Sequence, residues 1–211
     1  MLKFLPQIII VTCVFTQTFI YVKGIKNNTV KPILATRIFL LLAFLLTFLT
    51  NYSQTGLRGL GANMFNIVDI LSVLATFIAM GFSENKHRKF TKFEQICLYF
   101  VILVFLMWIV SGQNILANIL IQIILVIAYL PTLIHLWKSQ ENTESMSAWS
   151  LDFLASIFGM IEPLQLMAIL PLIYGIRSTI STFIVVALIV RIKWREVKLK
   201  EKSFILSSPL F

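Results

Sequence analysis

Apolar residues in this chain occur in long, uncharged runs. Residues 4–22 and 38–57 each form one such run, and residues 61–82 form a third that is interrupted only by Asp69. A helix needs about 20 apolar residues to cross the ~30 Å hydrocarbon layer of a bilayer. The pattern therefore predicts three membrane-spanning helices in the first part of the chain.

Four more spans are predicted in the remainder. Residues 95–137 carry no charge, which is too long for one span but fits two helices joined at the polar residues 111–114. Two further spans are expected at residues 147–170 and 172–192. The chain is thus expected to cross the membrane seven times.

The last predicted span has a charge-free centre that covers only residues 178–190. Arg177 precedes this centre, and Arg191 and Lys193 follow it. Long cationic side chains near helix ends can extend to the membrane surface. We expect these three side chains to do so.

Composition and charge agree with a membrane protein. Of 211 residues, 58% are apolar and 13% charged, well below the roughly one-quarter charged fraction of soluble domains. Fifteen of the 18 Lys and Arg residues fall in alternate segments, namely the loops at 23–37, 83–94 and 138–146 and the tail after 190. The positive-inside rule then places the amino terminus outside and the carboxyl terminus in the cytoplasm.

This multi-pass protein is expected in a plasma or inner membrane. An anionic lipid leaflet accounts for the basic tail, so the bilayer is the expected partner of these charges and no nucleic-acid partner is predicted. Self-association into a homo-oligomer is left open.

A shift of 114 residues aligns the first three predicted spans with the last three. It gives 12 identities over the first 70 pairs, including residues 28–29 with 142–143 and Gly61 with Gly175. Three helices per unit make the two units parallel, with the fourth span as connector. The predicted fold is an all-α membrane protein in which two parallel three-helix bundles are joined by a linker helix.

This plan divides the chain into four parts. Residues 1–83 are the first three-helix unit, and residues 84–113 are a cytoplasmic loop with the linker helix. Residues 114–195 are the second unit, and residues 196–211 are a cytoplasmic tail.

The second unit contains a motif-like segment. Residues 129–132 read Tyr-Leu-Pro-Thr, and residues 143–147 read Thr-Glu-Ser-Met-Ser. The matching place in the first unit, residues 16–18, reads Thr-Gln-Thr. Together with the repeat, these segments resemble the SWEET sugar transporters of the PQ-loop superfamily. Those proteins carry Pro-Gln near the cytoplasmic end of a unit's first helix and a Thr-Glu-Gly-Leu-Ser-like loop about a dozen residues later. The resemblance implies transport of a small polar solute by alternating access.

Asp69 is expected near the bilayer midplane, where an ionised carboxylate costs at least ~2.5 kcal/mol. It should therefore face protein or a cavity, as a solute-binding and proton-coupling residue or as a structural acid bonded to a Ser or Asn. Asn66 lies one turn away on the same helix face. In SWEETs an asparagine of each third helix contacts the substrate, which makes Asn66 a candidate solute-binding residue.

The second unit departs from the family pattern because Ile180 stands in the place of that asparagine. The nearby hydroxyls of Ser178 and Ser181 are candidates to replace it, although serine can also bond to its own helix. Glu162 is a further solute-binding candidate, and its alternative partner is Arg177.

Three residues are candidate hinges. Gln17 and Pro131 occupy the motif positions, and Pro163 lies in the predicted sixth span. Proline removes a backbone hydrogen bond and permits a helix to bend. Proline is also simply tolerated in membrane helices, which is the alternative for Pro163.

SWEET-like units often carry a tryptophan about fourteen residues after the loop serine, and it stacks on the sugar. The corresponding residues here are Thr47 and Ile161. The carboxyls of Asp69 and Glu162 point instead toward the proton-coupled, amino-acid-type carriers of the superfamily. The solute class, whether sugar, amino acid or vitamin-like, stays open.

A non-transporting receptor or assembly factor of the same fold is the alternative function. No metal cluster, Ser-His pair or Cys-His pair converges in the sequence, so we expect neither an enzyme nor a cofactor or metal. Cys13 and Cys97 fall inside spans and are interpreted as packing residues. Asn118 and Gln122 are expected to join helices by hydrogen bonds.

Overall fold

The computed structural model describes residues 4–27, 29–30, 34–81, 92–138 and 144–207, which are helical with short turns and include no strand. The repeat positions 28 and 142–143 and most of the predicted cytoplasmic loop 83–94 lie outside these residues. The helices are α1 (Leu5–Lys26), α2 (Leu34–Thr55), the 3-10 helix η2 (Gly56–Gly59), α3 (Met64–Gly81), α4 (Lys92–Ser111), α5 (Asn114–Lys138), α6 (Met146–Phe158), α7 (Ile161–Gln165) and α8 (Ile169–Ser207).

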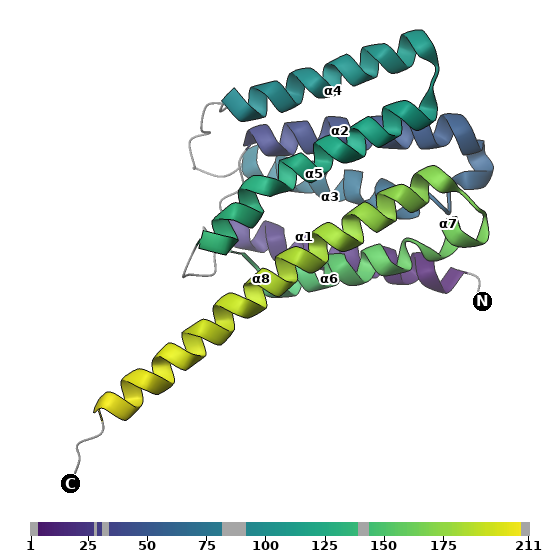
Figure 1. The fold of residues 1–211 in the computed structure, drawn as a ribbon. Helices are drawn as coiled ribbons and strands as arrows, with labels where there is room; N and C mark the ends of the chain where they lie inside the picture. The colour runs from purple at the N-terminus through teal and green to yellow at the C-terminus, as the bar shows by residue number, and fades with distance from the viewer. Residues whose placement is uncertain (1–3, 28, 31–33, 82–91, 139–143, 208–211) are drawn as a thin grey trace.

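Four helical stretches among the described residues are long and apolar enough to span a membrane. They are Leu5–Lys26, Arg37–Gly59, Met64–Gly81 and Ile169–Arg195. Helices α4 and α5 carry shorter apolar stretches. Successive long helices run back and forth along the bundle, and the two chain ends lie at opposite ends of it (Figure 1). The all-helical, membrane-type character of the fold is therefore confirmed.

The helix contacts follow the same pattern in both halves of the chain. In the first half α3 packs on α1 and α2, and in the second half α8 packs on α5 and α6. Between the halves α1 packs on α6, α2 packs on α5, and α3 touches α8. Exchanging α1 with α5, α2 with α6 and α3 with α8 leaves this pattern unchanged. Helix α4 packs on α2 and α5 at one side of the bundle (Figure 1).

Apolar side chains fill the bundle and also cover its outside. Val14, Ala43 and Leu125 are among the buried core residues. On α4, by contrast, Tyr99 is 69% and Val110 is 88% exposed. So much exposed apolar surface is untypical of a soluble monomer and fits contact with lipid.

The predicted sixth span is not one continuous helix. Helix α6 ends at Phe158, and α7 follows as a separate short helix. Gly159 directly follows α6, and a Cβ there would lie 2.9 Å from the Cβ of Phe65 on α3. Pro163 lies in the first turn of α7, where its missing N–H is not needed. It therefore belongs to a turn and does not bend a long helix.

The two halves do not follow one uniform shift. The paired helices begin at Leu5 and Asn114, at Leu34 and Met146, and at Met64 and Ile169, which are offsets of 109, 112 and 105 residues. Gly61 precedes α3, whereas Gly175 lies inside α8. Helix α8 begins early because the short α7 already completes the turn. The predicted seventh span, 172–192, lies within this single helix.

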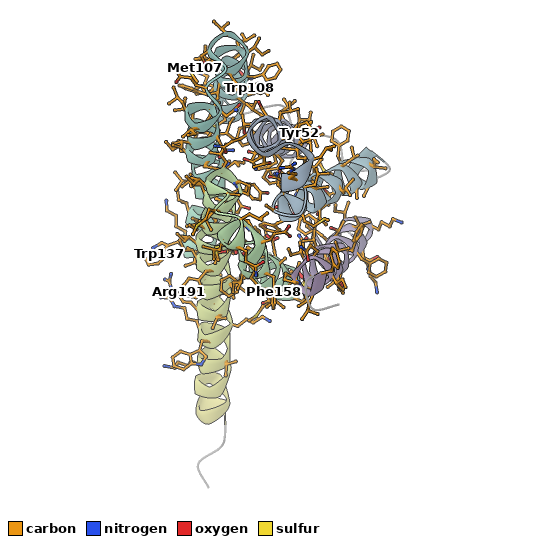
Figure 2. All side chains as sticks on the ribbon, turned by 90° about the vertical axis from the view of Figure 1, so that its right-hand side faces the viewer. Tyr52, Met107, Trp108, Trp137, Phe158 and Arg191 are labelled. Atoms are coloured by element: carbon orange, nitrogen blue, oxygen red, sulfur yellow. The ribbon has the colours of Figure 1, made fainter. Side chains whose placement is uncertain are left out.

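Aromatic rings cover arginines at the end of the bundle opposite the amino terminus. The guanidinium carbon of Arg191 lies 4.2 Å from the ring centroid of Trp137, on neighbouring helices (Figure 2). Arg37 at the start of α2 lies 4.8 Å from the ring centroid of Tyr21. Such cation–π contacts suit the interface between bilayer and water, which is where the charge pattern places this end.

Candidate functional site

Polar side chains from both halves of the chain meet inside the bundle. They come from α3, α5, α6 and α8; Asn66 lies in the first turn of α3, and the others lie further inside their helices. We call the following residues the central polar cluster: Asn66, Asp69, Gln122, Asp152, Tyr174 and Arg177.

Asp69 is bonded across the two halves. The Tyr174 hydroxyl on α8 donates a hydrogen bond to the Asp69 carboxylate on α3. The Tyr174 ring is 1% exposed and lies 5.9 Å from the ring centroid of Phe44 and 5.5 Å from that of Phe65. These rings fix the hydroxyl, so the carboxyl has a preset partner. Asp69 thus faces protein, as its predicted depth required, and remains partly exposed.

Arg177 does not extend to the membrane surface, contrary to the prediction. Its side chain is only 7% exposed, and its Nε donates a hydrogen bond of 3.0 Å to the Gln122 side-chain oxygen. The guanidinium carbon lies 4.8 Å from the Tyr174 ring centroid and 5.9 Å from that of Tyr129. These aromatic and amide contacts hold the cation inside the protein.

Two acidic side chains share the electrostatic environment of Arg177. Asp69 and Asp152 both lie close enough for the Arg177 charge to act on their carboxyl groups, and Asp152 also acts on Asp69. Like Asp69, Asp152 is partly exposed. The cluster therefore combines one cation with two carboxyls.

Asn66 is as deeply buried as Tyr174. It is 1% exposed, and neither its amide nitrogen nor its amide oxygen has a hydrogen-bond partner in the described part of the chain. Leaving a buried polar group unbonded costs about 1–3 kcal/mol. The solute-binding role of Asn66 stays a prediction.

A chain of amide and hydroxyl groups joins α5 to α2. Asn118 donates to the Asn51 side-chain oxygen at 2.9 Å and to the Thr50 hydroxyl at 3.0 Å. Gln122 donates to the Thr47 hydroxyl at 3.3 Å and accepts from Arg177. The predicted helix-joining role of Asn118 and Gln122 is confirmed, and Gln122 also links this chain of bonds to the cluster.

The serine candidates are buried on α8: Ser178 directly follows Arg177, and Ser181 lies one turn further along. Ser181 is 6% exposed and lines a cavity together with Arg177. Ser178 is 3% exposed, and its carbonyl accepts a 2.8 Å bond from the Thr182 hydroxyl. The Thr182 hydroxyl is thus bonded within its own helix, whereas Ser181 faces the cavity.

Glu162 lies apart from the cluster, contrary to the prediction. It belongs to α7, where it accepts a hydrogen bond from the Gln7 amide of α1. Gly61 lies against the same carboxyl group, and a Cβ there would collide with it. The alternative pairing of Glu162 with Arg177 is also not formed: Glu162 is bonded to Gln7, and the Nε of Arg177 is bonded to Gln122.

The predicted hinges leave no break in their own helices. Helix α1 is continuous through Gln17, and α5 is continuous through residue 131. The break lies instead around α7, where Met167 has a positive φ of 51°. Any movement at Gln17 or Pro131 stays a prediction.

Four members of the cluster were not predicted as site residues from the sequence. Gln122 was assigned to helix packing and Arg177 to the membrane surface, and Asp152 and Tyr174 were given no role. Asp152 carried a signal, because it is a charged residue inside a predicted span. Tyr174 carried none, since one tyrosine in an apolar run has no distinctive spacing.

The described residues contain no group of three or more His, Cys, Asp or Glu side chains that could hold a metal ion. Cys13 and Cys97 are both buried in the core, as expected of packing residues. No family model, curated protein or solved structure matches this chain. The resemblance to PQ-loop carriers therefore stays a prediction.

Proposed function

We propose that this chain is a membrane transporter that moves a small polar solute by alternating access. In this proposal it crosses the membrane seven times with its amino terminus outside. Helices α1–α3 form one unit, α5–α8 form the other, and α4 connects them. The central polar cluster is the solute site, and the two units rock about it to open one side at a time.

One observation carries the proposal: the matched contacts of the two halves bring polar groups of both to one interior place. Asp69 and Asn66 come from one half, and Tyr174, Arg177 and Asp152 come from the other. Buried ionisable residues are expensive inside a membrane and usually mark a pathway or a relay. A merely structural bundle has no need of three charged groups at its centre.

Asp69 is proposed to couple uptake to protons. It is bonded across the units to Tyr174, so a change in its protonation alters a contact that holds the units together. A neutral Asp69 would weaken the bond that its carboxylate accepts, because hydrogen bonds to a charged group are stronger. Proton release and rebinding would then accompany the exchange between open states.

Asp69→Asn tests this role. The amide keeps the shape and still accepts from Tyr174, but it cannot release a proton. We expect it to abolish proton-driven uptake into proteoliposomes and to preserve exchange of labelled solute. As a control, Glu144→Gln also turns a carboxyl into an amide, and it keeps an acceptor for the Trp149 indole, which donates to Glu144 at 3.0 Å. The control should retain both activities.

The panel of labelled solutes would contain sugars, amino acids and vitamins. Movement of none of them, together with binding of a peptide or protein partner, would favour a receptor of similar architecture. Normal proton-driven uptake by Asp69→Asn would remove the coupling role and leave Asp69 structural.

A further inference from the structure

A second feature lies beside the central polar cluster, on the other side of Arg177. A cavity of about 360 Å³ separates parts of α5 and α8. Its volume is within the range of small-molecule sites. Most of its lining is aliphatic, from side chains such as Val126, Leu133 and Ile180, and its polar lining is Tyr129, Arg177 and Ser181.

The cavity opens on the side of the bundle. Ile176 and Ile180 in its wall are 44% and 56% exposed, on a surface that we assign to lipid. Arg177, by contrast, is buried beneath them. The cavity is thus apolar at its mouth and cationic at its floor. This polarity matches an amphiphilic acid whose carboxylate lies at the floor and whose hydrocarbon chain lies toward the mouth.

The guanidinium group at this floor has unused bonding capacity. Its Nε is bonded to Gln122, but neither Nη1 nor Nη2 has a hydrogen-bond partner within the described residues. Guanidinium carries five N–H donors in a planar fork that matches a carboxylate through two parallel bonds. Asp69 and Asp152 act on the charge of Arg177, but neither fills these two donor positions, so the fork can still bond a ligand carboxylate.

We propose that this cavity binds a monocarboxylic acid with a short aliphatic chain. The carboxylate accepts hydrogen bonds from Nη1 and Nη2 of Arg177 and from the Ser181 hydroxyl. The chain lies against Val126, Leu133 and Ile180. A sugar would leave its hydroxyls unbonded on this lining, and a phosphate dianion would exceed the single cation.

Binding itself does not depend on the proposed function. Only the further step, that the bound acid is the transported solute, rests on the proposed transport by the two units. The experiment therefore measures binding and uptake separately.

Isocaproate and isocaproamide provide a matched pair of probes, because they share one shape and differ in charge. Calorimetric titration of the full chain in phosphatidylcholine nanodiscs should show saturable binding of isocaproate. The amide should bind at least about tenfold more weakly, since bonds to a charged group are lost. Arg177→Lys, which keeps the charge but not the planar fork of donors, should weaken the binding of isocaproate about tenfold.

Ile180→Trp keeps the test decisive if the arginine variant does not fold. Ile180 is on the exposed wall, so a larger side chain fills the cavity mouth without entering the core. We expect it to abolish isocaproate binding. Ile109→Trp, on the lipid-facing side of α4 at 59% exposure, is the matched control and should bind normally. Equal affinity for acid and amide, or normal binding by Ile180→Trp, would overturn the site.

Uptake in proteoliposomes separates the two proposals. Saturable, Arg177-dependent binding without uptake of isocaproate would support the site and contradict the acid as transported solute. Uptake of an uncharged panel solute, with no isocaproate binding, would support transport and overturn the site.

Discussion

Tyr174 is the residue through which the parts of the site touch one another. Its hydroxyl bonds Asp69, its ring packs against Phe65, and Arg177 lies over its face. A tyrosine can make all three contacts because it combines an apolar ring with a polar end. The geometry of the site therefore depends on one side chain that lies on the second half and reaches the first.

Gly159 limits how closely α6 and α3 approach. An added Cβ would lie 2.9 Å from Phe65, whereas nothing lies within 4 Å of a Cβ at Gly81. We expect Gly159→Ala to destabilise the protein by about 1–3 kcal/mol through overpacking. Gly81→Ala, in α3, should leave the stability unchanged or slightly higher, because alanine favours helix. Thermal unfolding in one detergent would compare them, and equal unfolding temperatures would contradict the tight contact.

For single residues, the sequence predicted correctly that polar side chains which are costly to expose to lipid lie in the protein interior. Asp69 and Asn66 were assigned to the interior by depth and spacing, and the structure places both there. Arg177 was assigned to the membrane surface because it lies near the start of the predicted span. From that position its long side chain can extend either to the surface or into the bundle. Which direction it takes depends on Gln122 and the two tyrosines, and these contacts exist only after the helices pack.

Two polar contacts join the halves near the end of the bundle that holds the amino terminus. One is Gln7 with Glu162, between α1 and α7, and the other is Asn118 with Asn51, between α5 and α2. In each case the first helix of one half is bonded to the second predicted span of the other half, which in the second half comprises α6 and α7. If the units rock as proposed, both contacts must separate for this end to open.

Cross-linking tests that requirement on a background in which Cys13 and Cys97 are replaced by alanine. A short bifunctional thiol reagent that joins Gln7→Cys to Glu162→Cys should abolish uptake, and cleavage of the linker should restore it. The control joins Thr18→Cys to Ser72→Cys, whose native hydroxyls lie 2.7 Å apart within one half. That link should leave uptake intact. Unchanged uptake with the first link would exclude rocking at this contact.

At the element scale, charge-free length predicted the helices better than their ends. The turn at residues 111–114 was found because polar residues interrupt an apolar run, and Gly112 has a φ of 63° there. The break after α6 was not found, since residues 153–161 continue the apolar pattern. Gly159 directly follows α6 and lies against the Phe65 side chain of α3, a contact between distant parts of the chain that the apolar pattern does not reveal.

At the scale of the whole molecule, α4 is the helix left outside the contacts that match between the halves. In the proposed plan each half crosses the membrane three times and ends on the side opposite to where it begins, and α4 returns the chain so that the two halves run parallel. The repeat in the sequence predicted this plan, and the offsets of the paired helices range from 105 to 112 residues. Insertions at the turns cost little in packing, so they shift the register without changing which helices meet.

We expect α4 to cross the membrane, with its start in the cytoplasm and its end outside. Helix α4 has 20 residues, about 30 Å of helix, which matches the hydrocarbon thickness. Lys92 at its start and Gln113 just after its end are both exposed. With the two native cysteines replaced, an impermeant maleimide should label Gln113→Cys on intact cells and Lys92→Cys only after permeabilisation.

The expected direction comes from charge. Arg177 lies inside the bundle, so 15 Lys and Arg residues on the predicted cytoplasmic side face only Lys3 and Arg58 on the other. Moving such positive loops across the membrane is opposed by the bias that sets orientation. Labelling of Lys92→Cys on intact cells would invert the topology, and equal labelling of both variants would show that α4 does not cross. Only the second result would also remove the alternating-access plan, because the two units would not be parallel if α4 did not cross.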